Sequence, residues 1–379
     1  MDLHSPTYLY ERTDWPRFRW DPSAVQAQIA AMEERQRLLL AAMGELGFEA
    51  RQETVLSVLV QEVQKSSEIE GELLDGAQVR SSVARRLGMD AAGLPRPARN
   101  VEGTVEMTMD ASLRYTEPLT AERLFGWHAA LFPTGRSGMA EIAVGKWREG
   151  AMPVLSGPMG RERVHFEAPP PESVEAEMRT FLDWFENEPV EPMLKAAIAH
   201  LWFVTIHPFE DGNGRIGRAI VDLALARFDR TEQRFYSMSA QIHEDKEAYY
   251  DILERTQKAS MDVTQWVQWF LGRLERALRA SEGVLEVVGV KTRFWQTHAA
   301  TPFNDRQRKV LNRLLDGFEG KLRTSKYAAI AKCSPDTALR DLGDLVAKGA
   351  LEKDESSGGG RSTSYILAPQ SADASSVTR

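Results

Sequence analysis

Residues 207–218 (HPFEDGNGRIGR) combine side chains that could carry out chemistry on a phosphorylated substrate. His207 can act as a general base near neutral pH, because the pKa of histidine lies in that range. Asp211 can hold a magnesium ion that also binds phosphate oxygens. The stretch therefore predicts a base and a phosphate site within one short loop.

The second half of the stretch predicts how phosphates would be held. The segment Gly212–Gly214 starts a predicted helix, where free backbone N–H groups and the helix dipole favour anions. Arg215 and Arg218 are three residues apart on this helix, so both guanidinium groups can reach one polyphosphate. A histidine before proline or a glycine pair is more often merely structural, but packing alone does not require this combination.

The stretch resembles the signature of the Fic family, H-x-F-x-(D/E)-G-N-G-R-x-x-R, at every fixed position. The resemblance implies transfer of AMP from ATP to a Ser, Thr or Tyr hydroxyl of a protein, or of this chain itself. It implies that His207 deprotonates the hydroxyl, that Asp211 binds Mg²⁺ and that Phe209 anchors the loop. The implied nucleotide contacts are Gly212, Asn213, Gly214, Arg215 and Arg218. A related kinase branch has lysine at position 214, so the glycine here favours nucleotidyl transfer.

Two further segments are similar to parts of Fic proteins. The runs 152–156 and 163–166 predict a β-hairpin, which the resemblance implies is a flap that pairs with the target segment. The implied flap residues are Met152, Pro153, Val154, Leu155, Val164 and His165. Tyr249 and Tyr250 resemble the segment that lines the nucleotide base, although two tyrosines on a helix are also common in a core.

A third segment, residues 65–71 (KSSEIEG), fits the pattern (S/T)-x-x-x-E-(G/N) of the family's inhibitory helix through Ser66, Glu70 and Gly71. The resemblance implies that Glu70 pairs with Arg218 and keeps ATP from its productive position. Ser66 precedes Glu70 by four residues on one helical face, so we expect it to steady the glutamate. Some family members also remove AMP with this glutamate, so both directions of the reaction stay open.

These segments require a mainly α fold: a helical Fic core with a β-hairpin flap, a helical N-terminal domain and a C-terminal winged helix-turn-helix. The predicted domains are 1–98, 99–285 and 295–368, with an inhibitory helix over about 53–71 and a disordered tail at 369–379. Apolar periodicity predicts helices over 23–46, 53–70, 120–131, 171–186, 192–206, 212–228 and 245–257.

The C-terminal part has the order of a winged helix-turn-helix, with helices over 306–316, 326–332 and 335–348, strands over 351–353 and 364–367, and a glycine turn at 358–360. Residues 303–367 hold 12 Lys and Arg against 9 Asp and Glu. The recognition helix, however, sets Arg340 and Lys348 against Asp336, Asp341 and Asp344. A DNA-binding regulator therefore remains an alternative function, but protein interaction is favoured over nucleic acid.

The composition limits the remaining possibilities. The 379 residues include 42% hydrophobic and 27% charged residues, with a net charge of −8 that gives no general attraction for nucleic acid. One cysteine, Cys333, excludes an internal disulfide and a multi-cysteine zinc site. The start lacks a signal-peptide pattern and no run is apolar enough to cross a membrane. We expect a cytoplasmic protein without a membrane partner and, by the resemblance, a homodimer.

Overall fold

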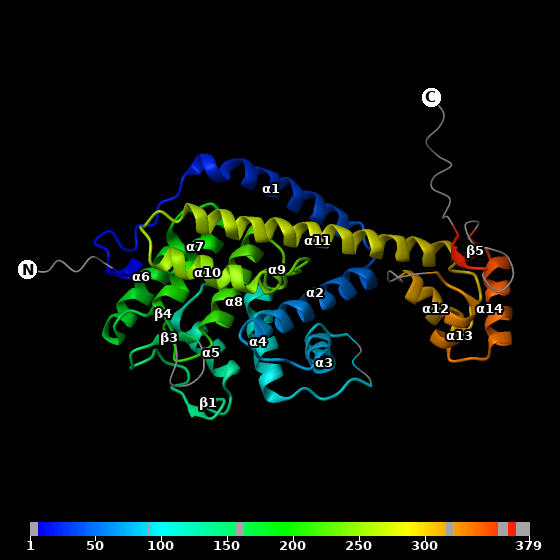
Figure 1. Ribbon diagram of the computed structural model, residues 1–379, viewed down its shortest axis with the longest axis horizontal. Helices are drawn as coiled ribbons and strands as arrows, with labels where there is room; N and C mark the ends of the chain where they lie inside the picture. Colours follow the sequence, from blue (N-terminus) through cyan, green and yellow to red (C-terminus); the bar gives the residue numbers. More distant parts are fainter. Residues whose placement is uncertain are drawn as a thin grey trace, which may run out of the picture. The chain divides into compact units, whose positions relative to one another are not determined.

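The computed structural model describes residues 7–89, 91, 93–156, 163–315, 321–354 and 363–368. Helices dominate it, which confirms the predicted mainly α class (Figure 1). The elements are η1 (Leu9–Glu11), α1 (Pro22–Gly44), α2 (Phe48–Ile69), α3 (Gly76–Arg86), α4 (Arg99–Leu113), α5 (Ala121–Leu131), β1 (Arg136–Ser137), β2 (Ala140–Glu141), β3 (Pro153–Ser156), β4 (Arg163–Glu167), η2 (Pro171–Ser173), α6 (Val174–Asn187), α7 (Pro192–Ile206), α8 (Asn213–Asp229), α9 (Met238–Glu244), α10 (Lys246–Gln257), α11 (Thr264–Thr297), α12 (Asp305–Leu315), α13 (Thr324–Ala331), α14 (Pro335–Ala347), β5 (Leu351–Lys353) and β6 (Tyr365–Leu367).

The chain forms two compact units, one made of residues 1–41 and 52–281 and the other of residues 42–51 and 282–379. Helices α1, α2 and α11 each contribute residues to both units. The single helix α11 runs through residues 285–295, which lie between the predicted limits of the second and third domains. The predicted domain limits themselves remain predictions.

The core of the first unit forms around α7. Its residues from Met193 to Ile206 are buried apart from Lys195, as expected of a helix that is apolar on every side. Helix α8 packs along it, and α4, α5 and α6 pack against this pair (Figure 1). The α7–α8 connection carries the predicted site, so the loop is held by the most deeply buried pair of helices.

Most of the predicted helices occur within a few residues of their expected limits. Helix α7 matches its predicted range, and Thr120 caps α5 by accepting the Arg123 backbone N–H at 3.2 Å. Helix α2 begins five residues earlier than expected and ends at Ile69, one residue early. Helix α3 was not predicted, because only Val79 and Val83 give it an apolar stripe.

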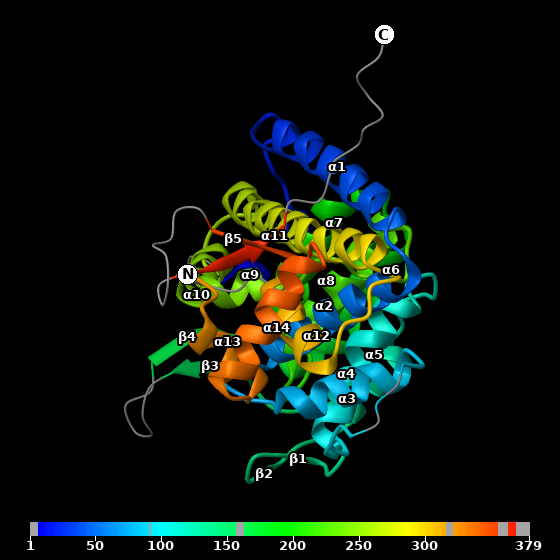
Figure 2. The ribbon, with the colours of Figure 1, turned by 90° about the vertical axis from the view of Figure 1, so that its right-hand side faces the viewer.

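The hairpin β3–β4 was predicted and is present, with antiparallel pairing from Pro153↔Glu167 to Ser156↔Arg163. A bulge lies between Val154 and Leu155, which pair with Phe166 and Val164. Strand β4 contacts α10, and Figure 2 shows the shorter hairpin β1–β2 below the two strands. The β1–β2 hairpin was not predicted, because strands of two residues leave no periodic signal.

In the second unit, α12, α13 and α14 precede the antiparallel pair β5–β6, in the predicted order. Leu322 forms an additional bridge to Tyr365. The core of the described part contains Phe294, Phe303, Val310, Leu311, Leu315, Leu322, Tyr327, Ala338, Leu342, Leu345, Ala350, Leu351 and Tyr365. The predicted glycine turn at 358–360 and the predicted tail at 369–379 lie outside the described residues.

One part of the charge argument for α14 was wrong. Asp341 does not face outward: it is buried and accepts hydrogen bonds from Arg306 at 2.9 Å and Tyr327 at 3.0 Å. Asp344 pairs with Lys348. Only Asp336 and Arg340 remain as unmatched charges on this helix, so the excess of acid predicted for its outer face is absent.

None of the helices within the described ranges combines the length and apolar character needed to cross a membrane.

Candidate active site

His207 ends α7 in a left-handed conformation (φ 51°, ψ 60°), which turns the chain sharply out of the helix. Its Nδ1 lies 3.2 Å from the carbonyl oxygen of Val204. A carbonyl only accepts hydrogen bonds, so Nδ1 carries the proton and Nε2 is left as the basic nitrogen. Burial lowers the pKa of His207 from 6.5 to about 4. The imidazole is therefore neutral at pH 7 and able to accept a proton.

Arg148 holds the backbone of His207 in place, a role that was not predicted from the sequence. The guanidinium is buried and donates to the carbonyl oxygens of His207 at 2.7 Å, Gly150 at 2.8 Å and Pro169 at 2.6 Å. Its own backbone N–H donates to the Pro208 carbonyl at 2.9 Å. One side chain thus ties the start of the loop to the segment leading into β3.

Phe209 anchors the middle of the loop. Its ring is fully buried and stacks on His128, with 4.2 Å between ring centroids and 9° between planes. The side-chain amide of Asn213 accepts from the Phe209 N–H at 3.0 Å and donates to its carbonyl at 2.8 Å. The amide is therefore committed to shaping the loop, which limits the phosphate contact predicted for Asn213 to its backbone N–H.

Gly212 and Gly214, at the start of α8, are required for different steric reasons. Gly212 is the N-cap with φ +81°, and a Cβ there would lie 2.9 Å from the Phe132 ring. A Cβ on Gly214 would lie only 2.0 Å from Oε1 of Glu70. Any side chain at 214 would therefore collide with that carboxylate, which occupies the space directly over the helix start where an anion would bind.

Asp211 lies at the wall of a cavity of about 840 Å³. One carboxylate oxygen accepts the Gly212 N–H at 2.6 Å and the other accepts the Ser137 hydroxyl. These contacts orient the carboxylate and leave lone pairs on both oxygens. Among the described residues no cluster of three metal-ligating side chains occurs, so a magnesium ion here would need phosphate oxygens as further ligands, as Mg²⁺ commonly does. The donor set fits such a shared site.

Arg218 is buried beneath the helix start, and three groups hold its guanidinium. Its Nη1 lies 2.8 Å from Oε1 of Glu70 in an ion pair. Its Nε donates to the Ser66 hydroxyl at 2.9 Å, and its Nη2 donates to the Ser66 carbonyl at 2.7 Å. Ser66 was expected to steady Glu70; its hydroxyl and carbonyl bind Arg218, the partner of that glutamate.

Tyr249 does not line an open nucleotide pocket, contrary to the prediction. Its side chain is 2% exposed and its hydroxyl lies 2.9 Å from Nε2 of His200, within the core. Tyr250 is 40% exposed, and its hydroxyl donates to the Ile69 carbonyl at 3.2 Å. Lys246 contacts the Glu68 carbonyl at 3.4 Å. Helix α10 thus holds the end of α2, which Glu70 directly follows.

The predicted flap residues lie on β3 and β4 or just before them. Val164 is 45% exposed, and the Met152 carbonyl accepts the Ala168 N–H at 3.0 Å, closing the base of the hairpin. His165 falls at the bulge, and its Nδ1 lies 2.6 Å from Glu254 on α10. His165 is therefore turned toward the helices in this structure. Pro153, Val154 and Leu155 lie on β3 by their backbone.

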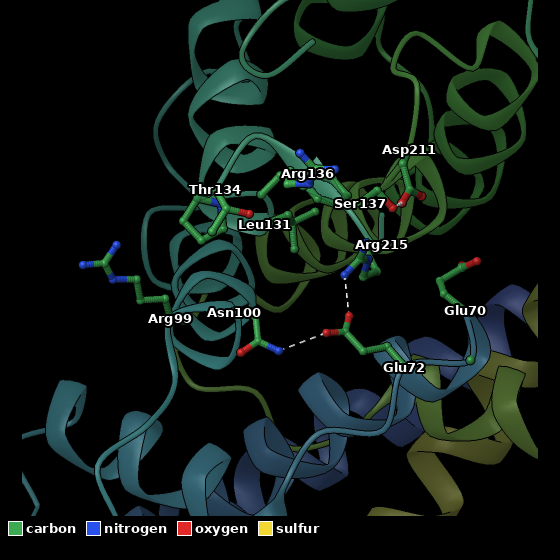
Figure 3. Close-up of a pocket in the computed structure, with 14 residues that line it drawn as sticks. Glu70, Glu72, Arg99, Asn100, Leu131, Thr134, Arg136, Ser137, Asp211 and Arg215 are labelled. Atoms are coloured by element: carbon green, nitrogen blue, oxygen red, sulfur yellow. Dashed lines mark hydrogen bonds and ion pairs between the residues drawn. The ribbon is translucent and has the colours of Figure 1, made fainter. Parts of the chain in front are cut away.

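Glu72 and Asn100 are among the cavity residues that sequence reasoning missed. Oε2 of Glu72 lies 2.7 Å from Nη1 of Arg215, and Oε1 accepts from Nδ2 of Asn100 at 3.1 Å (Figure 3). Glu72 directly follows the inhibitory pattern, and its acidic character two residues after Glu70 was the available signal. Asn100 is the second residue of α4 and belongs to no motif, so no nearby pattern marked it as a site residue.

Two segments of the chain match known protein families. Residues 118–225 match the model of the Fic/DOC family, and residues 8–89 match a model described as a domain of unknown function (DUF4172). The first match contains α5, both hairpins and the loop between α7 and α8. Residues 118–225 therefore form a Fic/DOC family domain.

Individual relatives resemble parts of the chain. A probable protein adenylyltransferase of Aquifex aeolicus (strain VF5) is 30% identical over 113 residues, 28% of this chain and 35% of the relative. A uridine 5'-monophosphate transferase of Xanthomonas campestris pv. campestris (strain 8004) is 30% identical over 118 residues, 29% of this chain and 21% of the relative. The chain thus spans about a third or less of these relatives' lengths.

A crystal structure of a Fic family protein from Desulfovibrio desulfuricans G20 has a similar fold over most of the chain. It matches with a TM-score of 0.55 and 23% identity, covering 94% of this chain and 99% of the other. At this identity the likeness concerns the fold alone.

Proposed function

We propose that this protein is a nucleotidyltransferase that moves AMP from ATP to a hydroxyl of a protein, its own chain included, and releases pyrophosphate. The observation that carries the proposal is the pairing, within one loop, of a neutral His207 with a glycine-bounded helix start bearing Arg215 and Arg218. The Fic/DOC domain match and adenylyltransferase relatives support the class of reaction. The relative named as a uridine 5'-monophosphate transferase makes the nucleotide itself a point to test.

Nε2 of His207 takes the proton of the target hydroxyl while that oxygen forms a bond to the α-phosphorus of ATP. The bond from this phosphorus to the oxygen bridging to the β-phosphate breaks, and pyrophosphate leaves with the electron pair. The guanidinium groups of Arg215 and Arg218 would bind the leaving phosphates through charge-assisted hydrogen bonds. The Nε–H of Arg215 is buried without an acceptor among the described residues, which suits an incoming phosphate oxygen.

Magnesium belongs to this proposal as a cofactor held by Asp211 together with phosphate oxygens. When bound, the ion would offset the negative charge on the phosphates. The hydroxyl of Ser137 and the N–H of Gly212 keep the Asp211 carboxylate oriented toward the cavity. The hairpin β3–β4 would present the target hydroxyl by pairing with an extended segment of the target.

In the structure described here the site would be inhibited. The Glu70 carboxylate holds Arg218 and fills the space over Gly214, where the terminal phosphate would lie. We propose that Glu70 is an intramolecular inhibitor, with Ser66 holding Arg218 and Gly71 reversing the chain after it. Mass spectrometry of the Glu70→Gly protein after incubation with each nucleoside triphosphate tests the reaction. Adducts of AMP support the proposal, adducts of UMP alone would change the nucleotide, and no adduct on any protein would contradict it.

The pKa of His207 predicts an unusual pH profile. Because burial lowers this pKa to about 4, the base is already deprotonated at pH 5.5. We expect the initial rate of self-labelling by Glu70→Gly to stay nearly constant from pH 5.5 to 8, with circular dichroism checking the fold at each pH. A rise in rate centred near pH 6.5, the ordinary value for histidine, would contradict the buried neutral base.

We further propose that the second unit is a winged helix used for protein contacts, including a homodimer, inside the cytoplasm. The order α12, α13, α14, β5, β6 and the bridge from Leu322 to Tyr365 support this assignment. Leu339 is 56% exposed on α14 and Ile366 is 45% exposed on β6, which suits contact with another protein.

The competing function, DNA binding by this unit, gives a distinct expected result. We expect no salt-dependent gel shift of the full chain with random duplex DNA at low ionic strength, because the unmatched charges on α14, Asp336 and Arg340, cancel. A shift that weakens steeply as salt rises would indicate phosphate contacts and favour the DNA-binding function. Substitution of Arg340 by alanine would then reduce that shift.

A further inference from the structure

Arg215 is restrained in the same manner as Arg218, by a second acidic residue. Its side chain is 8% exposed and forms an ion pair with Glu72, with Nη1 and Oε2 2.7 Å apart. The guanidinium carbon lies 5.2 Å from the centroid of the Phe132 ring. Asn100 holds the other oxygen of Glu72 (Figure 3). The buried Arg215 thus has a carboxylate partner on one side and an aromatic ring on another, and little freedom to reach a nucleotide.

The backbone explains how two carboxylates reach two arginines. Helix α2 ends with a Gly71 N–H bond to the Glu68 carbonyl and a Glu72 N–H bond to the Ser67 carbonyl, each 3.0 Å long. This pair of bonds with a left-handed glycine (φ +82°) forms a Schellman motif. It places Glu70 and Glu72 on either side of one fixed turn, both directed toward the first turns of α8.

We propose that Glu72 is a second inhibitory residue, which withholds Arg215 from the nucleotide phosphates as Glu70 withholds Arg218. The inference rests on the proposed function and extends it, since the inhibitory pattern read from the sequence ends at Gly71. Glu72 acts through Arg215 and is a positioning residue. Asn100 supports it by fixing the carboxylate from the α4 side.

Both acids lie at the wall of the same cavity. Glu70 is 32% exposed and lies over Gly214, where a Cβ would stand 2.0 Å from its Oε1. Glu72 stands at the wall of the cavity of about 840 Å³ and is a third exposed, so its carboxylate can turn away within the existing space. Phosphates that compete for Arg215 must therefore displace Glu72 first, at the cost of a charge-assisted hydrogen bond.

Nucleotide affinity in the absence of turnover tests the proposal. In a His207→Ala background, the Kd of ATP with Mg²⁺ is measured by calorimetry for the parent, Glu72→Gln, Glu70→Gly and the double variant. We expect Glu72→Gln alone to tighten binding about tenfold, the scale of one charge-assisted hydrogen bond. The double variant should bind more tightly than either single variant. Glu102→Gln, which removes an exposed charge on the neighbouring α4, should leave the Kd unchanged.

The outcomes separate this inference from the function on which it rests. If Glu70→Gly binds ATP but Glu72→Gln binds it no better than the parent, the role of Glu72 is overturned and the proposed function stands. Weaker binding by Glu72→Gln would likewise overturn it, because Glu72 would then prepare Arg215 for the phosphates. If no variant binds ATP, the proposed function fails, and this inference with it.

A second measurement follows Arg215 without any nucleotide. Phenylglyoxal modifies accessible arginines, and peptide mass spectrometry reports the modification of each residue. We expect Arg215 to react slowly in the parent and about tenfold faster in Glu72→Gln, while Arg218 stays protected by Ser66 and Glu70. Equal reactivity of Arg215 in both proteins would overturn the restraint that Glu72 is proposed to exert.

Discussion

Replacing Glu70 by glycine is expected to raise AMP transfer at least about tenfold over the parent protein, within the range typical of coupling between a regulatory contact and a site. The ion pair between Glu70 and Arg218 joins groups 2.8 Å apart, and the arginine is 2% exposed. Removing the carboxylate leaves the guanidinium without its charged partner and vacates the space above Gly214. ATP phosphates can then supply the missing negative charge, so the substitution favours binding in the productive position.

The measurement is transfer of label from ATP carrying a radioactive α-phosphate, with the parent and variant at equal concentration. Two substitutions serve as controls. Glu70→Gln keeps the size of the side chain and removes its charge, so it should give an intermediate rate. Glu49→Gly removes an exposed acid from the first turn of the same helix and should match the parent. Equal rates for Glu70→Gly and the parent would exclude the inhibitory role.

The same pair of proteins tests the reverse reaction. If Glu70 positions a water molecule that removes AMP, the parent protein added to labelled Glu70→Gly protein will release the label over time. We expect the label to persist, because Glu70 is engaged by Arg218 in this structure. Loss of label on addition of the parent, without loss on addition of Glu70→Gln, would show that removal of AMP predominates.

The sequence predicted the helices of the site well, because their signals are local. The apolar run of α7 and the glycine that ends α2 can each be recognised from a few neighbouring residues. Chain reversal at Gly71 depends on its positive φ, which only glycine adopts easily, so the end of α2 was predictable to one residue. Glycine motifs and apolar periodicity were therefore enough to predict most of the helices around the loop.

Contacts between distant segments could not be predicted in this way. Asn100 and Ser137 reach the site from α4 and from a hairpin of two-residue strands, and neither stands in a pattern that marks it. Tyr249 and Tyr250 are adjacent, so they lie on different faces of α10: the first faces the core with Ile252, and the second faces α2. Ile252 and Thr256, three and seven positions after Tyr249, are also buried. Helical periodicity could therefore have distinguished the buried Tyr249 from the more exposed Tyr250.

Replacing His207 should abolish transfer in the Glu70→Gly background, with a loss of about 100-fold to 10,000-fold, the usual contribution of a general base. The loop's other polar side chains have other partners: Asp211 is proposed to hold magnesium, Glu210 accepts the Ala143 N–H at 2.8 Å, and Asn213 is bound to the Phe209 backbone. The measurement is the same label transfer, with ATP affinity determined in parallel. We expect the affinity to be retained, because the phosphates are held by α8.

The choice of substitution separates chemistry from backbone strain. His207 has φ 51°, a region in which alanine is strained by about 1 kcal/mol and asparagine is tolerated better. Asparagine has no basic nitrogen, so His207→Asn preserves the turn and still removes the proton acceptor. If His207→Ala and His207→Asn are equally inactive while both bind ATP, the loss arises from the missing base. Activity restored by asparagine would show instead that position 207 serves the loop's shape, and the proton would have to leave by another route.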